Sequence, residues 1–176
     1  MGGSKAGATL AGRPLASYPV SVLADVCESV AIVCKPDTDL PEMGGAERWN
    51  EPAEPRHPLT GIVHALETAG GPVLVCAADM PFVTVDACLS MIEAAGNVGA
   101  VAIAAGVVQP TFGLYGPAAL ETLREAPEDA PLTETVTKLG LARVALPPRL
   151  VRSVNTPEEL ADAEAELSGA QLRTST

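Results

Sequence analysis

Residues 72–82, PVLVCAADMPF, are the stretch of sequence that decides the fold. Pro72 to Ala77 is a continuous apolar run of strand length, and such runs are typical of parallel strands covered on both faces. Asp79 follows almost at once, and Pro81 prevents regular structure from continuing. Ligands of open parallel sheets bind beyond the carboxyl ends of the strands, so Asp79 lies at a candidate ligand site. The alternative interpretation is that Asp79 caps the next turn or helix.

Similar runs recur on both sides of this stretch, with helical periodicity between them. We predict further strands at Ser29–Cys34, Ala100–Ala104, Pro110–Tyr115, Ala142–Leu146 and Leu150–Val154. We predict helices over Ser17–Val26, around Leu59–Leu66 and Val85–Ile92, and over Ala118–Arg124 and Leu132–Leu139. This alternation predicts an α/β fold: a single three-layer α/β/α domain with a mostly parallel sheet, formed by residues 1–168.

The last helix has the clearest start signal. Thr156 supplies an N-cap hydroxyl, Pro157 stands at the first helical position, and Glu159 follows three residues after the cap, as in a capping box. Residues 169–176 are expected to form a flexible tail.

Composition and charge exclude several classes of protein. The 176 residues are 47% hydrophobic and 19% charged, which argues against disorder. The net charge of -11 argues against general nucleic-acid binding. The four cysteines lack metal-site spacing and are expected to be buried cytosolic thiols. Val98–Leu120 has no charged residue, but its glycines and prolines predict strands and turns rather than a membrane span. We therefore expect a cytoplasmic protein with no membrane partner.

Two further segments carry groups suited to phosphate chemistry. Gly2 and Gly3 allow backbone amides to approach a phosphate, and Lys5 adds a positive charge. His57 opens a helix, and Gly61 in its first turn lets another group come close. Each segment has a simpler interpretation, a frayed terminus and a helix-start histidine.

Taken together and in order, these segments resemble the molybdenum cofactor guanylyltransferases and their nucleotidyltransferase relatives. The motifs that carry the resemblance are MGGSKA (1–6) with LAGRPL (10–15), PLTG (58–61), ADMPF (78–82), QPTFGLY (109–115) and VNTPEEL (154–160). The resemblance implies a Rossmann-like domain that transfers a nucleoside monophosphate from a triphosphate to a phosphorylated acceptor and releases pyrophosphate. It implies Mg²⁺ as cofactor, GTP or another nucleoside triphosphate as one substrate, and a molybdopterin-type acceptor as the other.

The resemblance also implies roles for individual residues. Lys5 matches the lysine that contacts the nucleotide phosphates, with Gly2 and Gly3 beside it. Asp79 matches the aspartate that binds Mg²⁺ and nucleotide, so Lys5 and Asp79 are the predicted catalytic residues. Glu51 lies near the position of an acidic nucleotide-binding residue, and Asn155 corresponds to an asparagine on the acceptor side. Asn155 is equally well explained as the residue that precedes the Thr156 cap.

The chain departs from the family pattern in three places. Its signature lacks an amino-terminal strand and a Leu-Ala-Gly-Gly loop ahead of Met1, and the hypothesis is that Met1 is an internal methionine of a longer frame. That strand lies centrally in such sheets, so its loss would expose unpaired backbone groups on both neighbours. His57 stands where many relatives have glycine, and Lys35 where guanylyltransferases often have asparagine near the base.

These departures leave other functions open. One is cytidylyl or other nucleotidyl transfer to a different phosphorylated acceptor. Another is a catalytically silent protein that binds a nucleotide or a partner. The last is a thiol-bearing α/β domain without a ligand.

Overall fold

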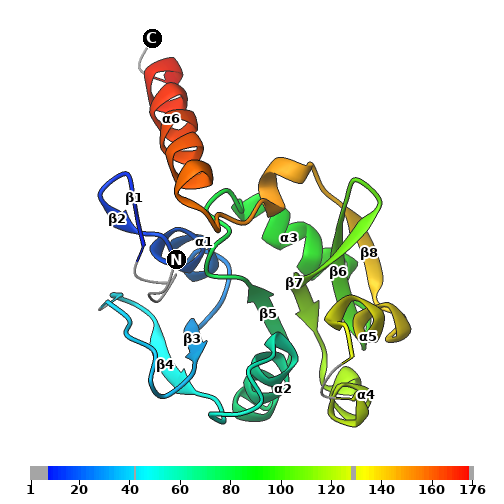
Figure 1. The fold of residues 1–176 in the computed structure, drawn as a ribbon. Coiled ribbons are helices and arrows are strands. Elements are labelled where there is room, and N and C mark those ends of the chain that lie inside the picture. The colour runs from blue at the N-terminus through cyan, green and yellow to red at the C-terminus, as the bar shows by residue number, and fades with distance from the viewer. Residues whose placement is uncertain (1–7, 42, 128–129, 175–176) are drawn as a thin grey trace.

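The computed structural model describes residues 8–41, 43–127 and 130–174 (Figure 1). The strands are β1 (Thr9–Leu10), β2 (Arg13–Pro14), β3 (Ala31–Cys34), β4 (Glu47–Asn50), β5 (Val73–Cys76), β6 (Gly99–Ala104), β7 (Val107–Tyr115) and β8 (Ala142–Ala145). The helices are α1 (Ser17–Ala24), α2 (Pro58–Ala69), α3 (Val85–Ala94), α4 (Leu120–Glu125), α5 (Leu132–Lys138) and α6 (Pro157–Thr174), with short 3₁₀ turns η2 (Pro117–Ala119) and η3 (Pro148–Val151).

The strands form three sheets. The largest has the order β5-β7-β6-β8, in which β7 is antiparallel to both neighbours and β6 is parallel to β8. Three of its four strands therefore run in one direction and β7 runs in the other. β3 and β4 form a separate parallel pair, and β1 and β2 form a small antiparallel hairpin.

Helices cover both faces of the main sheet. One buried cluster joins α1 and α3 to β6 and β7 through residues such as Leu23, Met91 and Phe112. A second cluster joins α2, α4 and α5 to the opposite face through residues such as Leu66 and Leu123. Two helical layers around a mixed sheet are the α/β architecture predicted from the sequence, with β7 as its antiparallel member.

One predicted strand is not formed, and the structure contains strands that were not predicted. Leu150–Val154 is not a strand: η3 occupies its start, because Pro147 and Pro148 have no amide hydrogen for a ladder and favour a turn. β4 was not predicted, because its sequence Glu-Arg-Trp-Asn is polar and lacks the apolar run of the inner strands. Most of its side chains are exposed to solvent, whereas its partner β3 lies toward the core.

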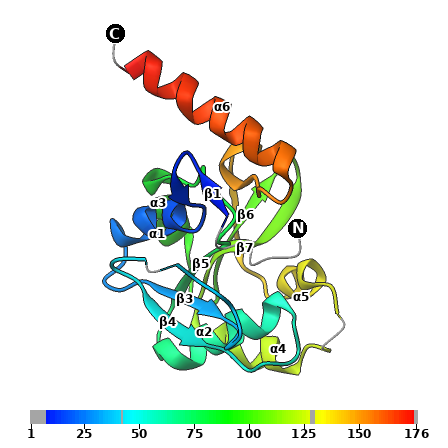
Figure 2. The same ribbon diagram turned by 60° about the vertical axis from the view of Figure 1, so that its left-hand side comes forward.

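The last helix begins as the capping box predicts. The amide of Glu159 donates to Thr156 Oγ1 (3.1 Å), and Glu159 Oε2 accepts from the amide of Thr156 (2.9 Å). α6 spans Pro157–Thr174. That residues 169–176 behave as a flexible tail stays a prediction. α6 projects away from the other elements in both ribbon views (Figures 1 and 2).

Among the described residues, no helix has the length and apolar character needed to cross a membrane.

Candidate functional site

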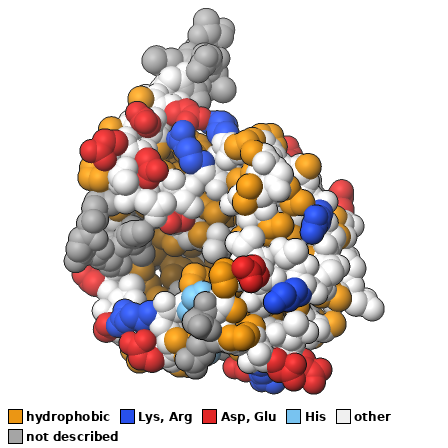
Figure 3. All heavy atoms as spheres, turned by 45° about the vertical axis from the view of Figure 1, so that its right-hand side comes forward, with side chains coloured by type: hydrophobic (Ala, Val, Ile, Leu, Met, Phe, Trp, Pro, Cys, Tyr) orange, Lys and Arg blue, Asp and Glu red, His pale blue; other side chains and the backbone are white. Residues whose placement is uncertain are grey.

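A cavity of about 400 Å³ lies between β3 and β5, beside α1 and the amino-terminal part of α2. Its wall is mostly hydrophobic, and the space-filling view shows the molecule hollowed, with hydrophobic side chains inside the hollow (Figure 3). Two carboxylates, Glu51 and Asp79, also line this cavity, together with Gly61 and Thr111. Both carboxylates are site residues predicted from the sequence, and the fold brings them to one cavity.

Asp79 is held by the turn that follows β5. The amide of Ala77 donates to the carbonyl oxygen of Thr111 on β7 (2.9 Å), and the amide of Met80 closes the turn onto the carbonyl oxygen of Ala77 (3.2 Å). The Met80 side chain is buried, so the turn is anchored in the core. Asp79 Oδ1 is itself buried, and no described residue forms a hydrogen bond with it. A carboxylate oxygen without a partner in an open cavity is available to a cation or to a ligand donor.

Glu51 follows β4 and is positioned by Lys35. The Lys35 ammonium lies 3.5 Å from Glu51 Oε1, and about nine-tenths of each side chain is buried. Lys35 also donates hydrogen bonds of 2.7 Å to the carbonyl oxygens of Pro52 and Pro55, which holds the following loop. The second oxygen, Glu51 Oε2, is buried and has no hydrogen-bond partner among the described residues.

This environment explains the departure at Lys35. The family resemblance placed it near the base, but in the structure its ammonium is directed to Glu51 and the loop carbonyls. Sequence reasoning missed this partnership. The signal that could have found it is a lysine directly after the apolar run of β3, because a cation at that place requires a buried anion nearby.

The start of α2 forms the wall beside Glu51. His57 is the N-cap residue, and its Nδ1 accepts a hydrogen bond from the amide of Leu59 (3.2 Å). This is the helix-start role that the sequence allowed for His57. A Cβ atom on Gly61 would lie 3.4 Å from Glu51 Oε2, which is an ordinary contact, so alanine would fit here and a larger side chain would extend toward the carboxylate.

Asn155 lies close to the Asp79 turn along the backbone. The preceding residue, Val154, donates its amide hydrogen to the carbonyl oxygen of Asp79 (2.8 Å). The amide of Asn155 donates to Glu159 Oε2 (2.6 Å), which lowers the pKa of Glu159. The structure thus assigns the Asn155 backbone to the α6 cap; an acceptor-side role for its side chain stays a prediction.

Gly2, Gly3 and Lys5, predicted to bind the nucleotide phosphates, lie outside the described residues. Their roles also stay predictions.

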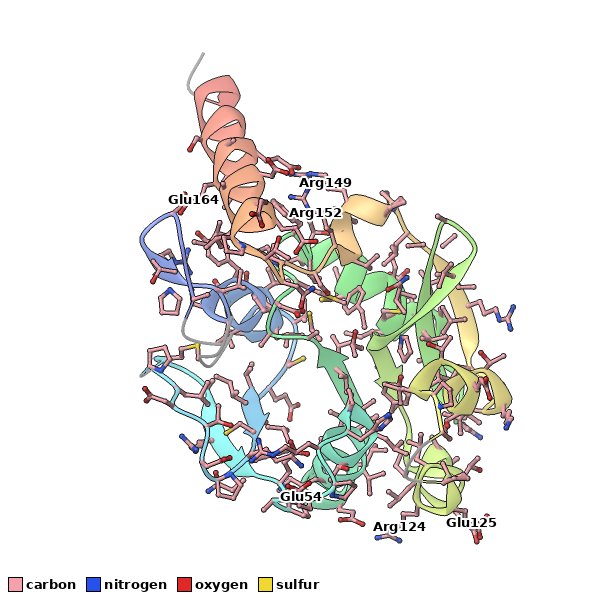
Figure 4. The ribbon with its side chains drawn as sticks, viewed as in Figure 1. Glu54, Arg124, Glu125, Arg149, Arg152 and Glu164 are labelled. Carbon is pink, nitrogen blue, oxygen red and sulfur yellow. The ribbon has the colours of Figure 1, made fainter. Side chains whose placement is uncertain are left out.

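A pair of arginines that the sequence analysis did not single out lies beyond the Asp79 turn. The guanidinium groups of Arg149 and Arg152 stack on Phe82, with distances of 5.0 and 4.5 Å to the ring centroid. Both arginines also form ion pairs with Glu166 on α6. Figure 4 shows Arg149 and Arg152 beside the start of α6. These contacts fix Phe82, and with it the end of the ADMPF segment, against η3 and α6.

Comparisons with known proteins show which family this chain belongs to. Residues 1–144 match the family model of the MobA-like NTP transferase domain. A molybdenum cofactor guanylyltransferase from Cereibacter sphaeroides is 34% identical over 95% of this chain and 90% of its own length.

Two solved structures share the fold at lower sequence identity. Molybdopterin-guanine dinucleotide biosynthesis protein A from Archaeoglobus fulgidus superposes with a TM-score of 0.72 at 19% identity, covering 94% of this chain and 91% of its own. 2-C-methyl-D-erythritol 4-phosphate cytidylyltransferase from Thermus thermophilus superposes with a TM-score of 0.71 at 21% identity, covering 92% of each chain. The family match over most of the chain, in agreement with the sequence motifs, shows that this protein belongs to the MobA-like NTP transferases and is a nucleotidyltransferase.

Proposed function

We propose that this protein transfers the guanylyl group of GTP to the terminal phosphate of a molybdopterin-type acceptor and releases pyrophosphate. The sequence likeness to a molybdenum cofactor guanylyltransferase supports the choice of base and acceptor. The structural observation that carries the proposal is the pair of buried oxygens, Glu51 Oε2 and Asp79 Oδ1, which have no partner among the described residues and belong to side chains lining one cavity.

The residues around Asp79 fit the Mg²⁺ that the family implies. A carboxylate oxygen is a preferred Mg²⁺ ligand, and Mg²⁺ usually takes only one or two carboxylates, with phosphate oxygens and water as its other ligands. The described residues contain no group of three or more His, Cys, Asp or Glu side chains that could hold a metal ion. Asp79 would therefore hold the ion together with the nucleotide, and the bound ion would neutralise charge on the phosphates.

The remaining chemistry needs positioning and positive charge. Attack by the acceptor phosphate on the α-phosphorus brings two anions together, and the leaving pyrophosphate gains charge. Lys5 would contact the phosphates, with the amides of Gly2 and Gly3 beside it. Glu51 Oε2 would accept hydrogen bonds from N–H or O–H groups of the nucleotide, and Asn155 would contact the acceptor. No covalent enzyme nucleophile is required, so the cysteines need no role.

Nucleotide titration tests the binding half of the proposal. GTP, CTP and ATP are each added with MgCl₂, and the melting temperature is followed. Ligand at about 100 times its Kd adds about 2.7 kcal/mol to the free energy of unfolding, so the preferred nucleotide is the one with the largest shift. A larger shift with CTP would replace guanylyl with cytidylyl transfer. No shift with any of the three would contradict nucleotide binding by this chain.

Pyrophosphate release tests the transfer half. Molybdopterin is added with GTP and MgCl₂, and we expect pyrophosphate to form in proportion to the acceptor. Binding of GTP without pyrophosphate release would identify a catalytically silent nucleotide-binding protein. Cytoplasmic location is a further prediction, tested by cell fractionation.

A further inference from the structure

Lys35 lies behind Glu51, away from the cavity. Among the described residues, Glu51 belongs to the lining of the 400 Å³ cavity and Lys35 does not. The Lys35 ammonium lies 3.5 Å from Glu51 Oε1 and donates to the carbonyl oxygens of Pro52 and Pro55, at 2.7 Å each. An ammonium group has three protons, and these three oxygens occupy them. Lys35 therefore has no donor left for a nucleotide.

The ion pair gives the two oxygens of Glu51 different surroundings. Oε1 faces Lys35, whereas Oε2 lies next to Gly61 and is buried without a hydrogen-bond partner among the described residues. A buried oxygen of a carboxylate is costly to leave unpaired, so a ligand in the cavity gains by donating to it. Turning the carboxylate would break its contact with Lys35. The lysine thus fixes the direction in which Oε2 points.

Glu51 and Asp79 belong to opposite sides of the cavity. Glu51 follows β4, which pairs with β3, and Asp79 follows β5; the cavity lies between β3 and β5. With Mg²⁺ and the phosphates at Asp79, as proposed above, the nucleoside would extend toward Glu51. A carboxylate repels phosphate oxygens, whereas the N–H groups of a base and the O–H groups of a ribose are the donors that Oε2 can accept from. Glu51 therefore fits the nucleoside half of the nucleotide.

We infer that Lys35 is a positioning residue for nucleoside recognition. It holds Glu51 so that Oε2 accepts a hydrogen bond from the nucleoside, and it does not touch the nucleotide itself. This inference rests on the proposed function and gives the departure at position 35 a role: Lys35 acts on the nucleotide through Glu51. The loop carbonyls of Pro52 and Pro55 keep the ammonium in place behind the carboxylate.

A double-mutant cycle tests this inference. The parent chain, Lys35→Met, Glu51→Gln and the double variant are each titrated calorimetrically with GTP and MgCl₂. Each single change should weaken GTP binding by about tenfold or more, because a hydrogen bond to a charged group is lost or misdirected. The double variant should bind GTP as Glu51→Gln does, within about twofold, because Lys35 acts only through Glu51. A double variant that binds GTP far more weakly than Glu51→Gln would overturn the inference.

The comparison of the double variant with Glu51→Gln holds even if Lys35→Met alone does not fold, because neither of these two proteins has a buried carboxylate without its cation. Tripolyphosphate with MgCl₂ then measures the phosphate half of the site by itself. Its affinity should stay within about twofold in all variants, because Glu51 and Lys35 face the nucleoside half. Equal weakening of GTP and tripolyphosphate binding would show a general structural effect and overturn the inference. Dideoxy-GTP identifies the donor: a Lys35→Met effect as large as with GTP assigns it to the base, and a lost effect assigns it to the ribose, both in support.

Arg48→Met is the matched control. The Arg48 guanidinium donates to three backbone carbonyl oxygens of the neighbouring loop, those of Lys35, Pro36 and Thr38. Its loss disturbs this loop without removing the cation beside Glu51, so GTP affinity should stay within about twofold. A loss as large as that of Lys35→Met would overturn the inference. Absence of GTP binding by the parent chain would contradict the proposed function itself, whereas parent binding with unchanged affinity in Lys35→Met would overturn this inference alone.

Discussion

The amide of Val154 donates a hydrogen bond of 2.8 Å to the carbonyl oxygen of Asp79. This single contact joins the turn after β5 to the segment that leads into α6. It places the residue proposed to hold Mg²⁺ beside the residue proposed to face the acceptor. The same segment is fixed on its other side by the capping box of α6.

Replacement of Asp79 tests the proposed metal and nucleotide site. Asp79→Asn removes the negative charge and keeps the shape, so turnover should fall by on the order of 10²-fold or more. The melting temperature should stay close to that of the parent chain, because Asp79 Oδ1 has no partner among the described residues. Asp86→Asn, at an exposed carboxylate in the first turn of α3, is the control and should keep full turnover. Near-normal turnover of Asp79→Asn would show that the site is misplaced.

Lys35→Met tests the buried ion pair. The change leaves Glu51 buried without its cation, which typically costs about 3–5 kcal/mol in the free energy of unfolding. Urea denaturation measures this loss. Adding Glu51→Gln to Lys35→Met should restore part of it, because no unpaired charge then remains.

The control for the ion pair is Arg124→Met. Arg124 pairs with Glu67 at the surface, where both side chains are substantially exposed. An exposed pair of this kind contributes about 1 kcal/mol or less. If Lys35→Met cost no more than Arg124→Met, the Lys35–Glu51 contact would have no structural role.

Two substitutions of Gly61 test helix stability and nucleotide binding separately. Gly61→Ala should raise the free energy of unfolding by up to about 1 kcal/mol, because alanine favours helix and its Cβ would make an ordinary contact 3.4 Å from Glu51 Oε2. Gly61→Leu extends into the cavity and should weaken GTP binding by about tenfold or more, measured by calorimetry, which corresponds to about 1.4 kcal/mol. Unchanged GTP affinity in Gly61→Leu would place the nucleotide elsewhere.

Thr156→Ala tests whether the α6 cap positions Asn155. Loss of the N-cap hydroxyl should cost about 1 kcal/mol of stability. If Asn155 contacts the acceptor, KM for the acceptor should rise while KM for GTP stays constant. Ser90→Ala removes a hydroxyl whose hydrogen bond lies within α3 and should change neither constant. A parallel rise in both KM values for Thr156→Ala would indicate a general structural effect instead.

The buried thiols predict a loss of stability at high pH. Burial raises the pKa of the Cys88 thiol from its ordinary value of 9.0 to about 12. Above pH 9 the unfolded chain therefore loses this proton while the folded chain keeps it, so stability falls as pH rises through this range. The melting temperature of Cys88→Ala should decline less steeply between about pH 8 and about pH 11 than that of the parent chain. Identical slopes would show that Cys88 does not contribute.

Many elements of the fold can be predicted from short stretches of the sequence. Continuous apolar runs identified β3, β5 and β6, and Thr156 with Glu159 identified the start of α6, because these signals depend on residues within a few positions of each other. The carboxylate after β5 was predictable for the same reason. The polar strand β4 was not predicted, and residues 150–154 were wrongly predicted to be a strand. In both segments the local sequence pattern does not match the structure that the segment adopts in the folded chain.

Other features exist only in the folded chain. Lys35 meets Glu51, and Val154 meets Asp79, because the packing of separate segments brings them together. The antiparallel direction of β7 and the unpaired edges of β3 and β5 likewise depend on which strands pair. Pairing joins backbone groups, which are the same in every residue except proline, so the local sequence does not specify it. The sequence by itself determined the elements and the candidate carboxylates. Only the tertiary structure decided which partners those carboxylates have and that both line one cavity, because burial and pairing arise from contacts between residues far apart in the chain.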